Sequence, residues 1–256
     1  RVFRSVRPDR TRQRTAGILR LLAGVGLALS TAAWAGREIP GRLDELDPRA
    51  REALERMESA YEALDAYRAR IVETRSLSVL AEEQVLEGTM TYAEPGRVRW
   101  EYREPEHRVY VLVGDHLKGW IPADQRVERV DLGRYRKRVN RMLGVGTGAE
   151  GLVDEFEIEL AAEQSLEGAD HLVLEPRSRR VRRRIEKLHM WIGRDRGMLR
   201  RIGYEVPPGD RVTIDFLDIE RNPSIDEATF ELDVPEEAAV VEGETSFGVP
   251  GLTGSD

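Results

Sequence analysis

The sequence predicts a mainly β (α+β) fold built on one antiparallel sheet of about eleven strands, strongly curled or nearly closed. Three observations support this. From Tyr67 onward, apolar and polar residues alternate with the period of two that is typical of half-buried strands. Turn signals such as Glu94-Pro95-Gly96 separate the strands at short intervals. A helical period appears in only a few places.

The chain opens with a predicted secretory signal over residues 1–35. An arginine-rich stretch precedes the apolar run Leu21–Leu29, and Ala33-Trp34-Ala35 forms a small-residue site with expected cleavage after Ala35. The apolar run is shorter than the roughly 20 residues of a membrane span. We therefore expect export by the Sec route, followed by a flexible lead over residues 36–47.

The first element of the domain is a helix. Asp47-Pro48 is a good helix start, since it places a capping carboxylate before a proline at the first helical position. Apolar residues then recur at helical spacing up to Leu64, opposite a charged face. Such a helix is stable only when its apolar stripe lies on something.

Strands follow in two groups. A basic segment at Leu132–Leu143, expected to be helical, and a flexible stretch at Gly144–Gly148 separate the groups. The expected strands are Tyr67–Ser76, Glu82–Tyr92, Arg97–Tyr102, Arg108–Val113, His116–Ile121, Arg126–Val130, Glu155–Leu160, His171–Glu175, Ile185–Ile192, Met198–Val206 and Arg211–Ile219.

The alternation indicates which face of the sheet is buried. Val98, Trp100 and Tyr102 share one face of their strand, and charged residues occupy the other. Each strand therefore contributes half of its side chains to one interior. The helices either fill that interior or leave it partly open.

Charge and composition exclude several classes of protein. The net charge is −7, and the seven Arg and one Asp of residues 1–35 leave −13 on the remainder. This balance argues against a nucleic-acid-binding protein. The chain has no Cys, so neither a disulfide nor a lipid-modified cysteine is available to it.

The sequence offers little catalytic chemistry. Its four His lie on different strands without metal-ligand spacing, and no Gly-x-Ser-x-Gly elbow is present. Gly146–Gly151 matches a dinucleotide fingerprint but lacks the surrounding strand–turn–helix unit, so a mobile loop is the better interpretation. We expect no enzyme activity, no metal and no cofactor.

One dense basic run interrupts this acidic chain. Its interpretation is either a solvated hairpin loop or a docking patch for an acidic partner or lipid headgroups. The candidate residues are Arg179, Arg180, Arg182, Arg183 and Arg184.

Several blocks, taken in order, resemble the LolA family of periplasmic lipoprotein carriers. The first strand carries Tyr67-x-Ala69-x-Ile71-x-Glu73. The block Pro95-Gly-Arg-Val-Arg-Trp100-Glu-Tyr102 follows, and the ending runs from Asn222-Pro through Phe230 to Pro235. The resemblance implies an incomplete barrel over residues 48–241, with helices as a lid over an apolar cavity, and a flexible tail over residues 242–256.

The same resemblance implies the function and the partners. Members of the family carry acylated lipoproteins from an inner-membrane ABC transporter (LolCDE-like) to an outer-membrane receptor (LolB-like), here expected as a monomer. The lid would be the Pro48–Leu64 helix together with Leu132–Leu152. The expected lining of the cavity is Ile71, Val98, Trp100, Tyr102, Val111, Leu188, Met190, Ile192, Ile202, Tyr204, Ile214 and Phe216.

Three departures from the family pattern leave the lid latch and the cargo open. Glu94 stands where well-studied members have the arginine that ties the lid shut, and Glu73 replaces the usual Gln. Lys118 lies where a Trp is usual in the fifth strand, and Trp120 follows two positions later on the same face. A carrier of another amphiphilic lipid, an RseB-like periplasmic sensor and a purely structural β-domain remain the competing hypotheses.

Overall fold

The structure is a computed structural model. It describes residues 43–78, 81–133, 148–163, 165–207, 209–243 and 245–246. The predicted signal, most of the predicted lead and nearly all of the basic segment from Leu132 to Leu143 lie outside these residues.

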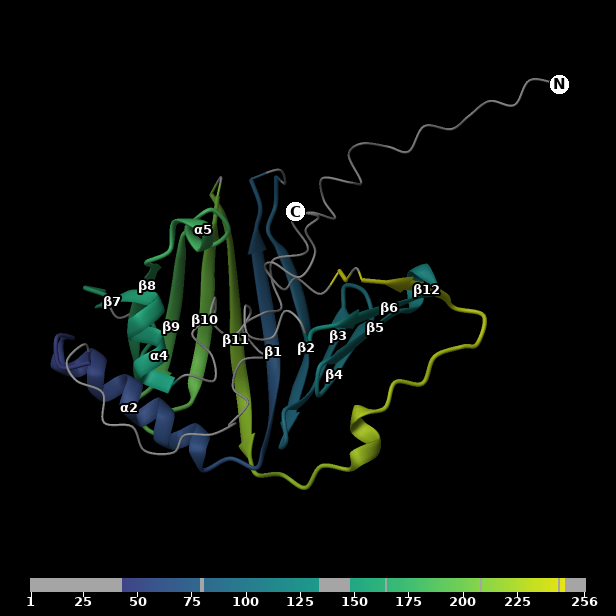
Figure 1. The fold of residues 1–256 in the computed structure, drawn as a ribbon, viewed down its shortest axis with the longest axis horizontal. Coiled ribbons are helices and arrows are strands. Elements are labelled where there is room, and N and C mark those ends of the chain that lie inside the picture. Colours follow the sequence, from purple (N-terminus) through teal and green to yellow (C-terminus); the bar gives the residue numbers. More distant parts are fainter. Residues whose placement is uncertain are drawn as a thin grey trace, which may run out of the picture.

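Twelve strands of the described residues form a single sheet. Figure 1 shows that this sheet is curved and open. Its spatial order is β12-β6-β5-β4-β3-β2-β1-β11-β10-β9-β8-β7, so the two halves of the chain meet where β1 pairs with β11. The strands are β1 (Ala66–Ser76), β2 (Gln84–Ala93), β3 (Arg97–Glu104), β4 (Arg108–Val113), β5 (His116–Ile121), β6 (Arg126–Asp131), β7 (Phe156–Leu160), β8 (Ala169–Pro176), β9 (Lys187–Gly193), β10 (Leu199–Val206), β11 (Asp210–Arg221) and β12 (Ala239–Glu242).

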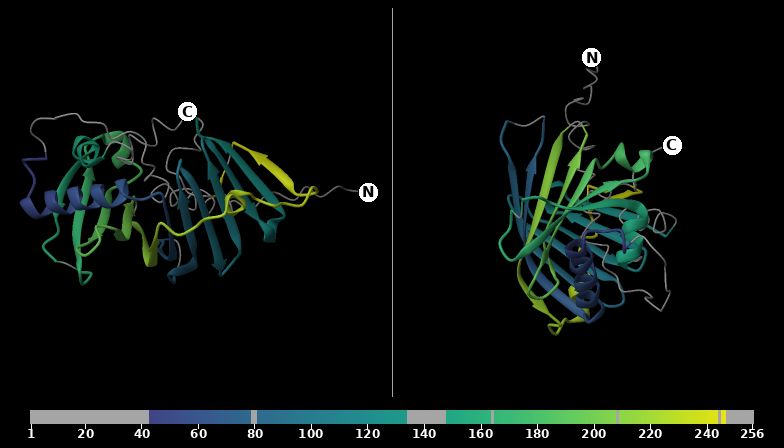
Figure 2. Two further views of the ribbon diagram at one scale, coloured as in Figure 1. Left: turned by 90° about the horizontal axis from the view of Figure 1, so that it is seen from below. Right: turned by 90° about the vertical axis from the view of Figure 1, so that its left-hand side faces the viewer.

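The sheet curves around two short helices. α2 (Pro48–Glu62) and α4 (Gly148–Glu155) lie on its concave side, against the β7–β9 end (Figure 2). Asp47 caps α2 as predicted, because its Oδ1 accepts hydrogen bonds from the backbone N–H groups of Arg49 (2.9 Å) and Ala50 (3.3 Å). The remaining short elements are α5 (Arg179–Arg182) and the 3₁₀ turns η2 (Pro122–Asp124) and η3 (Glu227–Phe230).

The predicted curled sheet is confirmed, and each of the eleven expected strands is present with small shifts at its ends. A twelfth strand was missed. β12 has mostly exposed side chains, so it shows no alternation, and it forms because the edge of β6 supplies its parallel hydrogen-bonding partner. The predicted flexible tail after residue 241 therefore begins, in the structure, with the last residue of β12.

The prediction of a mobile loop at Gly146–Gly151 was wrong for the residues from Gly148 onward, because α4 begins there. The helix forms because Ala149, Leu152 and Val153 are buried in the core, so tertiary packing overrides the local glycine signal. The basic hairpin loop likewise contains one helical turn, α5.

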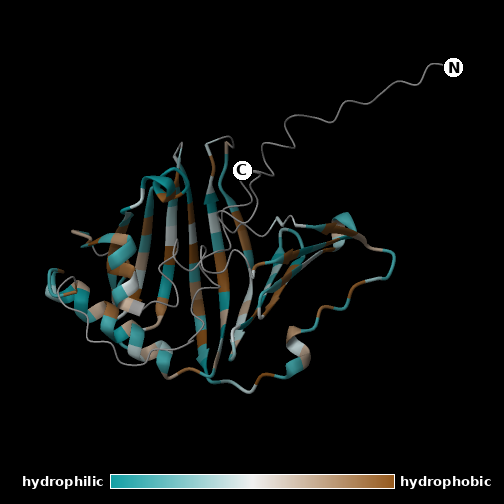
Figure 3. Cartoon of the chain, in the orientation of Figure 1, coloured by the Kyte–Doolittle hydropathy of each residue, from teal (hydrophilic) through white to brown (hydrophobic). Residues whose placement is uncertain are grey.

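Alternating burial gives the sheet two different faces, and Figure 3 shows polar and apolar residues in turn along the strands. Inward residues line up across strands: Ile214 of β11 pairs with Ile202 of β10, which pairs with Met190 of β9. The row continues to Leu172 of β8. The concave face therefore carries a continuous apolar surface.

The convex face is crossed by the segment from Asn222 to Ala238. The side chain of Asn222 begins this strap by accepting from the backbone N–H of Asp65 (2.8 Å) and donating to the carbonyl of Ala63 (3.1 Å). Phe230 of η3 is then buried against the outer side of β4, under the guanidinium of Arg97. The strap therefore packs on the convex face, whereas α2 and α4 pack on the concave face.

No helix among the described residues is both long and apolar enough to cross a membrane.

Candidate functional site

Eleven of the twelve predicted lining residues belong to one buried cluster on the concave face. They come from β1, β3, β9, β10 and β11, and each exposes 7% of its surface or less. In this structure α2 and α4 pack on part of the same cluster. The eleven are Ile71, Val98, Trp100, Tyr102, Leu188, Met190, Ile192, Ile202, Tyr204, Ile214 and Phe216.

Val111 is the exception, and its placement in the lining was wrong. Strand β4 turns Tyr110 and Leu112 inward, since they pair with Trp100 and Val98. Val111 therefore points to the convex face and packs in a second cluster with Phe230. Since β4 is apolar on both faces, its composition did not reveal which residues point inward.

α2 covers the β7–β9 end of the concave face through small and apolar side chains. Ala50, Ala53 and Leu54 are completely buried, and Met57 is nearly so. The alanines allow the helix backbone to come close to the strands. This contact hides apolar surface that β8 and β9 would otherwise expose.

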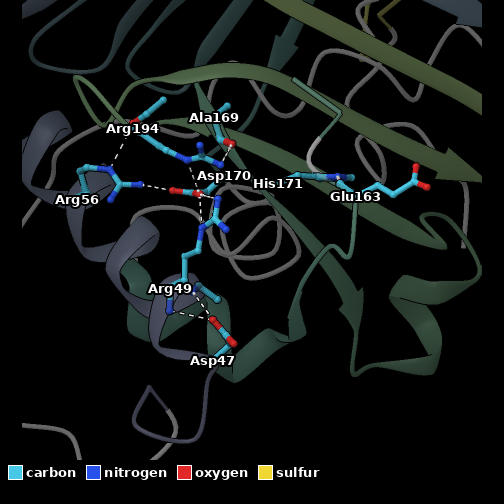
Figure 4. Close-up of polar contacts among 10 residues, drawn as sticks. Asp47, Arg49, Arg56, Glu163, Ala169, Asp170, His171 and Arg194 are labelled. Carbon is cyan, nitrogen blue, oxygen red and sulfur yellow. Dashed lines mark hydrogen bonds and ion pairs between the residues drawn. The ribbon is translucent and has the colours of Figure 1, made fainter. Parts of the chain in front are cut away.

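A buried carboxylate fixes the position of α2, as Figure 4 shows. Asp170, at the start of β8, accepts hydrogen bonds from Arg49 Nε (2.8 Å) and Arg56 Nη2 (2.6 Å), which lie in the first and third turns of the helix. Arg194, just after β9, adds a third bond of 2.9 Å to the same side chain. We call this group of four residues the Asp170 clamp.

The electrostatics of the clamp favour the ionised carboxylate. Desolvation would raise the pKa of Asp170, but hydrogen bonds from Arg194, Arg49 and Arg56 outweigh it and hold the pKa below its ordinary value. Its side chain is only 3% exposed, whereas those of Arg49 and Arg194 are each 45% exposed. No local pattern pointed to Asp170, because its partners lie more than a hundred residues away or beyond the next strand.

The other end of α2 is held by aromatic side chains. The backbone N–H of Leu199 donates to the hydroxyl of Tyr61 at 3.4 Å. Tyr61 meets Tyr67 of β1 edge-on, and Tyr67 stacks on Tyr92 of β2. The helix is thus attached at both ends by polar or aromatic contacts, while its middle rests on apolar side chains.

An acidic group lies where α2 faces α4. Burial and the neighbouring carboxylates of Glu62, Glu150 and Glu55 raise the pKa of Glu58 to about 7. The two covering helices therefore repel each other more strongly as Glu58 ionises.

A buried polar centre interrupts the apolar concave face. Glu73 of β1 is fully buried, accepts from Arg75 Nε at 2.5 Å and also accepts a hydrogen bond from the Tyr102 hydroxyl. Burial, followed by the nearby Glu73 charge, raises the pKa of Tyr102 well above its usual value. The alternation did signal this centre, since Glu73 and Arg75 are in phase with the inward Ala69 and Ile71.

A second inward carboxylate binds the end of the described chain. Glu128 of β6 accepts from the Thr245 hydroxyl (3.0 Å) and from the backbone N–H of Ser246 (2.6 Å). The Ser246 hydroxyl also lies 2.9 Å from the Tyr110 hydroxyl. Thr245 and Ser246 therefore lie on the concave side, next to β6.

Two of the four histidines come together on the convex face. His171 Nε2 lies 3.1 Å from His189 Nδ1, and Trp191 stacks on His171. Sequence spacing had suggested that all four were dispersed. Across the described residues, no group of three or more His, Cys, Asp or Glu is arranged to hold a metal ion.

Comparisons with a family model and with curated proteins both find outer-membrane lipoprotein carrier proteins. The family model described as outer membrane lipoprotein carrier protein LolA matches residues 65–233. A curated outer-membrane lipoprotein carrier protein of Chromohalobacter salexigens is 29% identical over 160 residues, covering 62% of this chain and 71% of that protein.

Comparison with solved structures gives matches at low sequence identity. An uncharacterized conserved protein from Thermus thermophilus matches with a TM-score of 0.50 and 14% identity, covering 76% of this chain and 99% of that one. The Mycobacterium tuberculosis lipoprotein LppX matches with a TM-score of 0.46 and 14% identity, covering 70% of this chain and 100% of that one.

Replacing Asp170 by Asn should loosen α2. Removing the charge that three guanidinium groups share is expected to lower the free energy of unfolding by about 2 kcal/mol, measured by urea denaturation. Hydrogen exchange should accelerate in α2 and stay unchanged in β1 and β11. Asp195→Asn, which removes an exposed ion pair of 3.7 Å, is the matched control and should change little. Equal protection of α2 in the two variants would contradict the clamp.

Replacing Glu58 by Gln should stabilise the protein in a pH-dependent way. Because folding raises this pKa from 4.5 to about 7, the folded state holds the extra proton between these values, and stability is lost as pH rises through them. At about pH 8 the melting temperature of the variant should exceed that of the wild type. Near pH 4.5 the two melting temperatures should be equal. Glu52→Gln, at an exposed site on α2, should show no such trend. A pH-independent difference would refute the assignment.

Proposed function

The chain belongs to the LolA family, and from this premise we propose that it is a periplasmic carrier for lipoproteins. It binds their acyl chains on the concave face of the sheet and moves them from the inner to the outer membrane. The observation that carries the proposal is the continuous apolar row across β8 to β11, whose β8–β9 end is covered by α2.

Acyl chains gain access when α2 and α4 move away from the sheet. The row residues are nearly inaccessible in this structure, and at the β8–β9 end of the row a ligand must take the place of α2. Each buried CH₂ is worth about 0.8 kcal/mol, so an acyl chain can replace the apolar contacts that α2 gives up. The acyl chain then moves from one apolar environment to another. The free-energy difference is therefore small, and the carrier can release the chain as well as bind it.

The Asp170 clamp is the latch for this movement. Its guanidinium groups are half-exposed at Arg49 and Arg194, so water solvates them when α2 lifts away. This polar latch stands in for the lid arginine of well-studied members, whose place is taken by Glu94. The side chain of Glu94 instead accepts a hydrogen bond from the Tyr92 hydroxyl.

The remaining parts of the proposal follow from the sequence and the family. Residues 1–35 direct export by the Sec route, and the mature chain works in the periplasm as a monomer. A LolCDE-like inner-membrane ABC transporter supplies the cargo, and a LolB-like outer-membrane receptor accepts it. The protein binds without catalysing a reaction, without a cofactor and without nucleic acid.

A second candidate function is transport of a different amphiphile with a polar group inside the carrier. The polar centre of Glu73, Arg75 and Tyr102 favours it, since a purely acyl ligand has no use for a buried ion pair. An RseB-like sensor is the third alternative, and it is distinguished by binding a signalling protein without cargo transfer.

Met190→Gln should weaken cargo binding, and because Met190 is buried it should also lower the melting temperature. The two side chains have similar length and flexibility, so packing is retained while the inward row gains an amide that an acyl chain cannot satisfy. Affinity for a triacylated lipopeptide, measured by displacement of a fluorescent fatty acid, should fall about fivefold or more. Val85→Gln, on the exposed convex side of β2, is the control and should bind normally. Unchanged affinity in a folded Met190→Gln protein would refute binding on this face.

A further inference from the structure

The region around α5 concentrates positive charge on an acidic protein. Its exposed members are Arg179, Arg180, Arg182 and Arg183, which we call the α5 patch. They lie in the connection between β8 and β9, within a chain of formal net charge −7. No acidic residue occurs between Arg177 and Ile185.

The α5 patch differs from other arginines in how it is neutralised. Elsewhere, arginines of the sheet and helices form ion pairs, such as Arg201 with Asp215 (2.7 Å) and Arg211 with Glu205 (3.0 Å). Among the residues that the structure describes, the four patch side chains have no carboxylate partner. Arg182 donates only to the backbone carbonyl of Arg177 (3.1 Å). The positive charge of the patch is therefore available to a ligand.

The fold holds the patch in place. Ile185 is buried in the concave core and Val181 packs against it, so the apolar side chains of this segment point inward. Arg177 Nε fastens the start of the connection by donating to the carbonyls of Val153 (3.2 Å) and Phe156 (3.1 Å). The outward surface consequently presents guanidinium groups without an apolar anchor.

The position of the patch relates it to the concave face. β8 ends and β9 begins at the end of the sheet opposite the Asp170 clamp, since Asp170 lies at the start of β8 (Figure 1). α5 stands at that far end, on the rim of the concave core, while α2 is clamped at the other. A surface bound by the α5 patch would therefore face the end of the concave core that lies away from the clamp.

We propose that the α5 patch docks the protein on a bilayer through the phosphates of anionic lipid headgroups. Guanidinium groups match phosphate oxygens in bidentate geometry. A protein partner would instead gain affinity from apolar anchors, and the patch offers none because Val181 and Ile185 point inward. Each basic residue near an anionic surface adds attraction that salt screens.

Vesicle flotation with the full mature chain tests this proposal. The wild type should bind vesicles containing phosphatidylglycerol at low salt, should bind pure phosphatidylcholine vesicles far less, and should be released by high salt. Arg179→Gln/Arg180→Gln/Arg182→Gln should reduce binding by about tenfold or more. Arg68→Gln/Arg70→Gln/Arg129→Gln changes the net charge equally at ion-paired sites and should bind as the wild type does.

Three results would overturn the docking proposal. They are equal binding to both kinds of vesicle, equal loss in the two triple variants, and retention on immobilised polyglutamate without vesicle binding, which would assign the patch to an acidic protein. Melting temperatures confirm that both variants fold. The proposal does not depend on cargo transport, since the lipopeptide displacement assay contains no vesicles and tests that function separately.

Discussion

The position of α2 depends on one buried carboxylate. Without Asp170, the guanidinium groups of Arg49, Arg56 and Arg194 would converge on the same point and repel each other. With it, the helix is drawn onto β8 and β9, and its alanine-rich stripe hides part of the concave row. Apolar contact alone does not fix how α2 is oriented on the sheet, because the hydrophobic effect is non-directional. The hydrogen bonds of the clamp fix that orientation.

The concave face combines apolar rows with buried polar groups. Glu73 with Arg75 and Tyr102 forms one polar centre, and Glu128 with Thr245 and Ser246 forms another. Buried ionic groups seldom add net stability compared with apolar residues of similar size, so their place in the interior is better explained by specificity than by folding.

Much of the sheet could be predicted from the sequence because alternation is a local signal. It identified the inward side of β3, β10 and β11 correctly and put Glu73 in phase with Ile71. Alternation failed at β4, where both faces are apolar and Val111 was wrongly assigned to the inward face. It also failed at β12, which forms only because β6 offers it a hydrogen-bonding partner. The Asp170 clamp was missed for the same reason, since only the fold brings its residues together.

The fold, the family and the Asp170 clamp on α2 together support the proposed carrier, which would open to accept acyl chains. The measurement that tests this most directly is mass spectrometry of the protein crosslinked in, and purified from, the periplasm of its own host. We expect triacylated lipoproteins joined to residues of the concave face. Recovery of the protein with a membrane signalling partner and no lipid, or with no partner at all, would contradict the carrier mechanism.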